Sequence, residues 1–220
     1  MQKCSPCIFR YHPYMHRGDA PCGLRERKKL RTRETILARA RELFDAQGFR
    51  DTTIPEIAAA AEVSPRTVSS YFPHKEELVF NDKDEVLDSL TEALEARADG
   101  EMATEAMRAW LIDSFADAAP EDIARHRWAR DLIDSDPDLR AYERRLQERV
   151  ERAIATAVAV DLSLPADHHL PRMVAATAMA ALDSLGRESA VGHPSPDESR
   201  SLIEDAMQFV GAGVRELQAG

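Results

Sequence analysis

Residues 53–71, TIPEIAAAAEVSPRTVSSY, contain two helix starts only eleven residues apart, and this spacing constrains the fold more than any other feature. The first start is a capping box, because Thr53 is followed three residues later by Glu56 and each side chain can accept a hydrogen bond from the other's backbone N–H. Ser64 is expected to cap the second helix, and each helix has a proline in its first turn, where a missing N–H costs little. Two capped helices of about two turns, joined by a tight turn at residues 62–63, form a helix-turn-helix.

The rest of the chain is also predicted to be helical. A helix is expected from about Leu24 to Gln47, because apolar residues recur there at spacings of three and four, and Gly48 can close its C-terminus. After Pro73 the periodicity predicts helices at about 74–98, 103–118, 121–134, 137–160, 167–190 and 197–217. No alternating run of β-branched residues predicts a strand. We therefore expect an all-α protein.

Charge is distributed unevenly along this chain, whose net charge is −10. Residues 1–75 carry 14 Lys and Arg against 8 Asp and Glu, whereas residues 76–220 carry 15 against 31. A basic head on an acidic body places the positive potential on the segment that holds the helix-turn-helix, which favours contact with nucleic acid there. The acidic body argues against a non-specific architectural DNA binder, because most of its surface would repel phosphate.

The second helix of the pair is expected to turn Val68 and Phe72 inward. Its outward side chains are then Pro65, Arg66, Ser69 and Ser70. A helix of this length fits the major groove of DNA, about 12 Å wide, with its N-terminal half against base edges. Thr67, Tyr71 and Lys75 lie where phosphates would pass. The alternative is an αα-hairpin that only packs against its neighbours.

The stretch from Thr32 to Val79, TRETILARARELFDAQGFRDTTIPEIAAAAEVSPRTVSSYFPHKEELV, resembles the TetR family of bacterial regulators. The resemblance implies an N-terminal three-helix, helix-turn-helix DNA-binding domain and a C-terminal helical domain for ligand binding and dimerisation. It also implies a homodimer that represses by binding a palindromic operator and is released by a small-molecule effector. The expected boundaries are a disordered tail at 1–23, the DNA-binding domain at 24–75 and the effector and dimerisation domain at 76–220.

Family roles can be carried over to matching positions. The recognition helix falls on Ser64–Tyr71. The positions expected at phosphates are Thr53, Thr67, Tyr71 and Lys75, and those expected at bases are Pro65, Arg66, Ser69 and Ser70. The family often has a larger aromatic pair where this chain has two serines, so Arg66 becomes the best candidate for direct readout of guanine, with a phosphate contact as the alternative. The basic run at residues 25–33, RERKKLRTR, is a further candidate for backbone or minor-groove contact, or else a solvated helix start.

An effector pocket is expected among the helices at 103–160, where apolar and aromatic residues recur. Its candidate lining residues are Met107, Trp110, Leu111, Phe115, Trp128, Leu132, Tyr142 and Leu146. Such stripes are equally what a helix needs for its core face, so a core role is the alternative. Fold-level analogy alone suggests a hydrophobic or acyl-type effector.

The last two helices are the expected dimer surface, because they carry apolar stripes with many small residues that allow close approach. The stripe at 167–190 consists of Met173, Val174, Thr177, Ala178, Ala181, Leu182 and Leu185, and that at 197–217 of Leu202, Ile203, Ala206, Phe209, Val210 and Val214. Two such helices from each subunit could form a four-helix bundle. The alternative is that both stripes are internal core.

Sequence motifs typical of enzymes, metal sites and membrane segments bear on the alternative functions. It has no GxSxG, HExxH, GxxxxGK[ST] or GxGxxG motif, so neither an enzyme nor a cofactor is expected. The alternative regulator is a metal or redox sensor that uses the tail residues Cys4, Cys7, His12, His16 and Cys22, although a single CxxC lacks a second pair at standard spacing. No metal site is predicted. Without a signal peptide or a long apolar run, a cytoplasmic protein that does not engage a membrane is expected.

Overall fold

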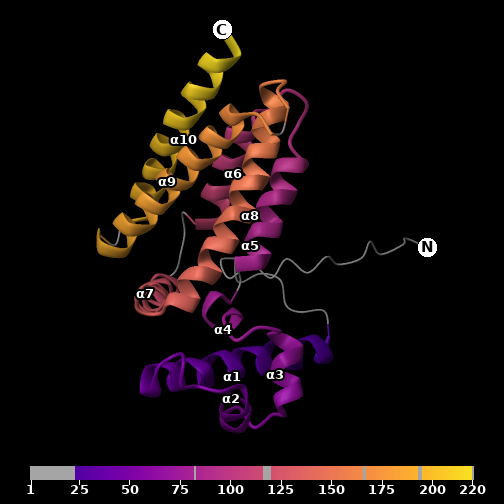
Figure 1. Cartoon of the computed structure of the whole chain (residues 1–220), viewed down its shortest axis with the longest axis vertical. Coiled ribbons are helices and arrows are strands. Elements are labelled where there is room, and N and C mark those ends of the chain that lie inside the picture. Colours follow the sequence, from indigo (N-terminus) through magenta and orange to yellow (C-terminus); the bar gives the residue numbers. More distant parts are fainter. Residues whose placement is uncertain (1–22, 82, 116–119, 166, 193–194, 220) are drawn as a thin grey trace, which may run out of the picture. The chain divides into compact units, whose positions relative to one another are not determined.

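The computed structural model describes residues 23–81, 83–115, 120–165, 167–192 and 195–219, and within these ranges the regular elements are all helices. Figure 1 labels them in chain order. Their bounds are α1 Leu24–Gln47, α2 Ile54–Ala60, α3 Pro65–Tyr71, α4 Glu77–Phe80, α5 Lys83–Glu95, α6 Ala103–Phe115, α7 Pro120–Ser135, α8 Pro137–Asp161, α9 His169–Gly192 and α10 Pro196–Ala219. The predicted all-α fold is confirmed.

The predicted helix at 74–98 is wrong as a single element, because the chain breaks it at Asn81. Three consecutive residues of α4, namely Leu78, Val79 and Phe80, are all buried, which one face of a continuing helix could not achieve. Asn81 then adopts a positive φ of 45°, and its carbonyl accepts a hydrogen bond from Arg33 Nη2 at 3.0 Å. The break therefore lets three consecutive apolar side chains be buried, and hydrophobic periodicity alone does not predict this.

The described chain divides into two compact units that do not follow chain order. The head unit contains residues 23–84 and 123–151, and the body unit contains residues 85–122 and 152–219, so that α8 belongs to both. Most of α7 and the first part of α8 belong to the head unit by their contacts, and the predicted functional boundary near residue 75 stays a prediction.

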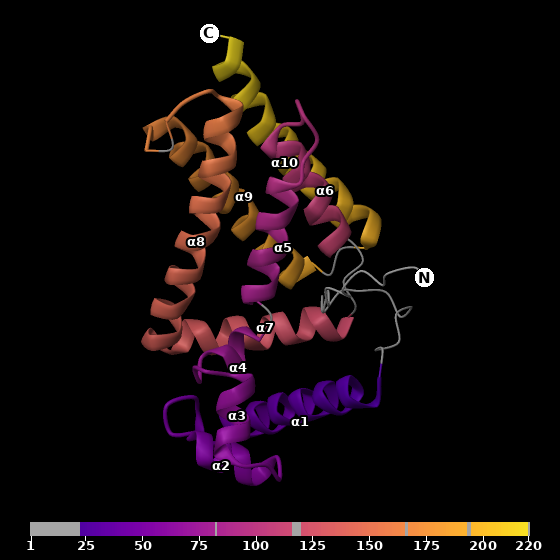
Figure 2. The same ribbon diagram turned by 90° about the vertical axis from the view of Figure 1, so that its right-hand side faces the viewer.

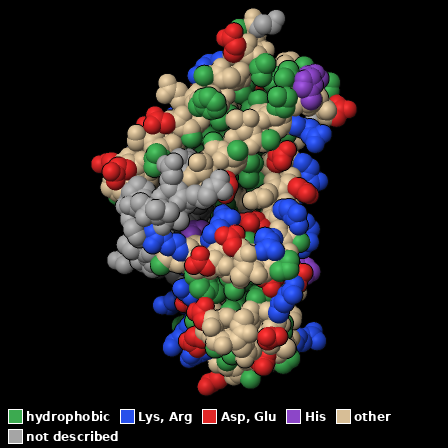
Figure 3. Space-filling model, turned by 60° about the vertical axis from the view of Figure 1, so that its left-hand side comes forward, with side chains coloured by type: hydrophobic (Ala, Val, Ile, Leu, Met, Phe, Trp, Pro, Cys, Tyr) green, Lys and Arg blue, Asp and Glu red, His purple; other side chains and the backbone are tan. Residues whose placement is uncertain are grey.

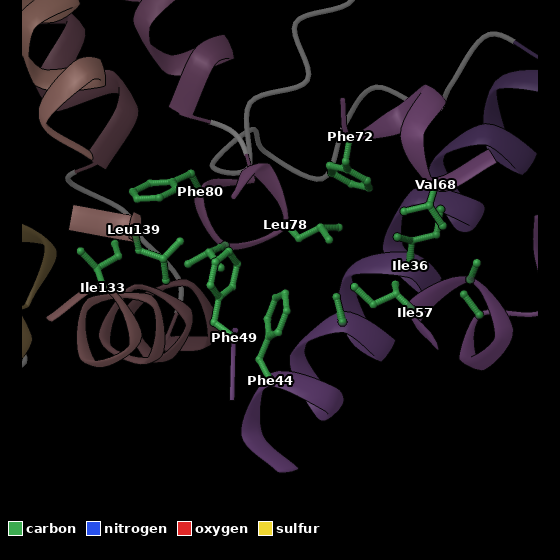
Figure 4. Close-up of a cluster of buried hydrophobic side chains, with 14 of the residues drawn as sticks. Ile36, Phe44, Phe49, Ile57, Val68, Phe72, Leu78, Phe80, Ile133 and Leu139 are labelled. Carbon is green, nitrogen blue, oxygen red and sulfur yellow. The ribbon is translucent and has the colours of Figure 1, made fainter. Parts of the chain in front are cut away.

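The core of the head unit is built from both of its chain segments, as Figure 4 shows. Ile36 and Phe44 of α1 meet Val68 of α3 in the same cluster as Ile133 of α7 and Leu139 of α8. All five are buried, and full burial of such a side chain stabilises the fold by about 1.5–3 kcal/mol. The helix-turn-helix therefore rests on helices that lie far away in the sequence.

The body unit is built on α10, which packs against both α6 and α9 (Figure 2). Its inward stripe consists of Ile203, Met207, Val210 and Val214. A buried ion pair joins Arg97 to Asp161 at 3.1 Å, and the second Asp161 oxygen accepts the backbone N–H of Ala103 at 2.7 Å. These contacts hold the end of α8 and the start of α6 together.

Candidate nucleic-acid interface

The start of α2 is the predicted capping box. Thr53 donates its backbone N–H and its hydroxyl to Glu56 Oε2, at 2.8 and 2.7 Å, and Glu56 N donates back to Thr53 Oγ1 at 3.4 Å. The side-chain hydrogen bond from Thr53, followed by the backbone one, lowers the pKa of Glu56 below its usual value. The geometry confirms the predicted helix start.

The turn between α2 and α3 is closed by backbone hydrogen bonds. Glu62 has a φ of 55°, in the left-handed region, and Val63 N donates to Ala58 O at 2.9 Å. A left-handed residue followed by an N–H that donates to the carbonyl five residues earlier is the Schellman motif, which terminates a helix. The tight turn predicted at residues 62–63 is therefore present, although its left-handed residue is a glutamate rather than a glycine.

Helix α3 separates an apolar inner face from a polar outer face. Ser64 Oγ accepts the N–H of Thr67 at 3.0 Å and so caps the helix. Val68 is fully buried and Phe72 nearly so, which fixes the helix rotation. The opposite face consists of Pro65, Arg66, Ser69 and Ser70, all exposed as predicted.

The hydroxyl-bearing residues expected at phosphates differ in exposure. Thr53 is exposed, whereas Thr67 and Tyr71 are half-buried beside the outer face of α3. The Thr67 hydroxyl lies 2.8 Å from Ser64 Oγ, and the Tyr71 ring is tilted against Phe72 with the ring centroids 6.4 Å apart. Their contacts with DNA stay predictions.

Lys75, which is expected at a phosphate, makes several contacts within the chain. Its ammonium group donates to the carbonyls of Phe49, Arg50 and Thr52, at 2.8, 3.4 and 3.0 Å, and lies 4.2 Å from the centre of the Phe49 ring. An ammonium group has three hydrogen-bond donors, so these carbonyls satisfy all of them. Lys75 therefore fastens the loop between α1 and α2, which positions the cap of α2.

The basic start of α1 also divides into two kinds of residue. The Arg33 guanidinium lies over the Phe72 ring at 5.3 Å and donates to Asn81 O, so it ties α1 to α3 and α4. The exposed basic side chains of the run are Arg25, Arg27, Lys28, Lys29 and Arg31. These five are the part of the run that is placed to reach DNA.

Comparison with known proteins places this geometry in a family. Residues 36–81 match the family described as "Bacterial regulatory proteins, tetR family", and residues 101–215 match the "MftR C-terminal domain". The chain is 37% identical over 176 residues to the HTH-type transcriptional regulator TcmR of Streptomyces glaucescens, a match that covers 76% of each chain. The chain belongs to the TetR family of transcriptional regulators.

Two further TetR comparisons cover most of the chain. It is 30% identical over 194 residues to MftR of Mycobacterium tuberculosis, named as a mycofactocin biosynthesis transcriptional regulator, with 87% of this chain and 95% of that protein covered. The fold is similar to that of FadR from Thermus thermophilus, a repressor solved in complex with lauroyl-CoA, with a TM-score of 0.51 and 24% identity. That match covers 81% of this chain and 92% of FadR. The matched proteins are regulators, and the predicted family is confirmed.

The residues predicted to line an effector pocket are distributed between the two units of this TetR chain. Met107 and Leu111 are buried in the body unit, and Trp110, also in the body unit, donates its indole N–H to Ser89 Oγ at 3.0 Å. The four from α7 and α8 pack instead on the core of the head unit, and they are Trp128, Leu132, Tyr142 and Leu146. The side chain of Phe115 lies outside the described part of the structure. The burial of Met107 and Leu111 and the packing of the four head-unit residues fit the alternative of core packing, and a pocket lined by these residues stays a prediction.

Three contacts that sequence reasoning missed connect α7 and the start of α8 to α1 and to the loop between α1 and α2. Trp128 donates its indole N–H to Asp45 on α1 at 2.6 Å, and Arg50 pairs with Asp136 at 3.1 Å and with Asp138 at 3.3 Å. The partners are separated by more than 80 residues along the chain, so no local pattern could indicate them.

The remaining sequence hypotheses concern metals and membranes. Cys4, Cys7, His12, His16 and Cys22 lie outside the described residues. In the ranges that the structure describes, no cluster of His, Cys, Asp or Glu is arranged to hold a metal ion. Within the same ranges, no helix is both long enough and apolar enough to cross a lipid bilayer.

Proposed function

We propose that this TetR regulator is a ligand-responsive repressor that binds a palindromic operator as a homodimer and leaves it when a small-molecule effector binds. The observation that carries the DNA-binding part is helix α3, whose inner face is anchored by Val68 while Arg66 and the two serines stand exposed on the other side. A helix held in this way can enter the major groove without losing its own packing.

The proposed contacts follow from this exposure. Pro65, Arg66, Ser69 and Ser70 face the bases, and Thr53, Thr67 and Tyr71 hold phosphates, with Ser64 at the positively polarised start of α3. Lys75 acts indirectly, through the loop that it fastens. Arg66 is the residue that we assign to guanine, because a guanidinium can donate to both O6 and N7 of that base.

Selection of binding sites from random duplex DNA tests the proposal. The purified protein is expected to enrich an inverted repeat whose half-sites lie one helical turn apart, about 34–36 Å between centres. Enrichment of a single half-site would contradict binding as a dimer, and failure to enrich any sequence would contradict a specific operator.

The role of Arg66 can be tested on the selected operator. The Arg66→Ala variant is expected to lose about 1–3 kcal/mol of binding on the operator and to lose preference at one guanine position. The matched control is Arg200→Ala, which removes an exposed arginine from α10 in the body unit. An equal loss on every sequence would instead make Arg66 a phosphate contact.

We also propose that the effector is hydrophobic or acyl-type and binds in the C-terminal part. The C-terminal location is supported by the match of residues 101–215 to the MftR C-terminal domain, and the acyl class by the similarity of the fold to FadR, which was solved in complex with lauroyl-CoA. Native mass spectrometry of the purified protein, followed by operator-release assays with any co-purified molecule, tests this. If a co-purified acyl compound leaves the operator complex intact, that compound is not the effector.

A further inference from the structure

A groove lies between α6 and α10 in the body unit, where these two helices run side by side (Figures 1 and 2). Its volume is about 390 Å³, within the range of small-molecule sites, about 300–1,000 Å³. The lining residues used below are Glu101, Thr104, Glu105, Arg108, Met207, Gly211 and Arg215. None of them belongs to the DNA-contacting set or to the predicted effector pocket.

The floor of the groove is open because residue 211 has no side chain. A Cβ placed on Gly211 would lie 3.3 Å from Thr104 Oγ1 and 3.3 Å from Arg215 Nη1. The hydroxyl and the guanidinium therefore converge on the same point from opposite helices. A larger residue at 211 would crowd both groups.

Thr104 is the unusual residue of this floor. Only 3% of the surface of Thr104 is exposed, yet its Oγ1 has no hydrogen-bond partner within the described chain. Buried hydroxyls are normally paired, because leaving one unpaired costs stability. A ligand oxygen in the groove would give this hydroxyl an acceptor.

The groove is lined by two arginines and two glutamates, so its formal charges cancel, and the hydrogen bonds that each group already makes decide which of them can hold a ligand. Arg108 and Arg215 are exposed and, among the residues that the structure describes, neither has an ion-pair partner. The two glutamates of the groove accept backbone N–H groups instead, Glu101 from Ala98 at 3.0 Å and Glu105 from Met102 at 3.3 Å. Each glutamate keeps its negative charge while it accepts an N–H at its own turn, and the two exposed guanidinium groups are the donors of the groove that can bind an oxyanion directly.

We infer that the α6–α10 groove binds a small organic anion, whose carboxylate or phosphate group is held by Arg108 and Arg215 and accepts a hydrogen bond from the Thr104 hydroxyl. The apolar part of the molecule would lie against Met207. At about 100° per residue, the groove residues of α10 lie on the opposite side of that helix from exposed Phe209. Association of two subunits through the Phe209 side would leave the groove open.

Isothermal titration calorimetry with inorganic pyrophosphate and with glutarate tests this site without DNA. At least one probe is expected to bind saturably, and the stronger probe distinguishes a phosphate site from a carboxylate site. The Arg108→Gln/Arg215→Gln double variant is expected to bind at least tenfold more weakly. The matched control, Arg172→Gln/Arg200→Gln, removes the same charge from exposed positions of α9 and α10 outside the groove and is expected to bind normally.

Thr104→Val provides a second signature, because valine has nearly the same shape but no hydroxyl. This variant is expected to bind the probe several-fold more weakly while its melting temperature stays the same or rises, since the unpaired hydroxyl is removed. The proposal is overturned if neither probe binds saturably, if both double variants weaken binding equally, or if Thr104→Val binds as well as the parent. Each of these readouts is independent of operator binding, so the proposed repressor function stands or falls separately.

Discussion

At the scale of one residue, the two roles to be distinguished for Lys75 are stabilising the loop between α1 and α2 and binding a DNA phosphate. If its ammonium group only fastens the loop between α1 and α2, then Lys75→Met removes three hydrogen bonds and leaves three carbonyls without a charged donor. The variant is expected to lose about 1.5–3 kcal/mol of unfolding free energy, as measured by urea denaturation.

The same variant also separates loop fastening from phosphate contact. Its operator affinity is expected to fall through loosening of the Thr53 cap, while the dependence of log affinity on log salt concentration keeps its slope. A slope reduced by about 1, together with unchanged stability, would show that Lys75 binds phosphate directly.

Glu56 gives the capping box a pH dependence. Because hydrogen bonds from Thr53 lower its pKa in the folded state, the charged carboxylate stabilises the fold above the pKa of the unfolded chain, about 4.3. This contribution is expected to disappear as the pH falls through the lower, folded-state pKa. Urea denaturation of the parent and Glu56→Gln between pH 7 and pH 3 measures it: the stability difference should be constant above about pH 5 and shrink below pH 4. A difference that does not change with pH would exclude a role for the charge.

At the scale of elements, Trp128 of α7 makes the contacts that hold this helix against α1. Trp128 stacks near Phe44 with ring centroids 6.5 Å apart, holds the Arg41 guanidinium 4.9 Å from its ring centre, and donates to Asp45. Trp128→Phe keeps most of the ring but removes the hydrogen bond, so a loss of about 0.5–1.5 kcal/mol is expected. Faster amide hydrogen exchange at the end of α1 should accompany it.

A matched control exists in the other unit. Trp110 also donates its indole N–H to a side chain, Ser89, so Trp110→Phe makes the same chemical change on α6. It should leave exchange in α1 unchanged. If Trp128→Phe also leaves α1 exchange unchanged, then the hydrogen bond to Asp45 does not hold these helices together.

These elements also show which parts of the fold could be predicted from sequence. The caps at Thr53 and Ser64 and the inward face of α3 depend on neighbours within four residues, so local pattern was sufficient. The break at Asn81, the ammonium contacts of Lys75 and the Trp128 hydrogen bond depend on residues 23 to 83 positions away. An apolar stripe shows that a helix has a buried face, but it does not specify which helix covers that face, and so the predicted pocket residues could not be assigned to their units.

At the scale of the whole molecule, α10 carries a second apolar stripe beyond the one that packs inside the body unit. Phe209 is 72% exposed, and Leu217 lies on the same side of the helix, whereas Ile203 and Val210, also expected at the dimer surface, are buried. Met173 of α9 is 60% exposed as well, and Figure 3 shows hydrophobic side chains at the surface of the molecule. Because exposed apolar patches mark interaction surfaces, we propose that this outward side of α9 and α10 joins two subunits.

Phe209→Asp tests that proposal, since it places a charge on the outward stripe without touching the core. The variant is expected to be monomeric by light scattering at micromolar concentration, with unchanged helix content, and to bind a full palindrome at least tenfold more weakly than the parent. Binding to a single half-site should not change, because each head keeps its own α3. Val160→Asp is the matched control, as Val160 is 67% exposed at the end of α8 and lies off the stripe. A Phe209→Asp protein that still forms dimers would place the subunit interface elsewhere. Equal dissociation of both variants would show that the added charge, and not its position on this stripe, disrupts the dimer.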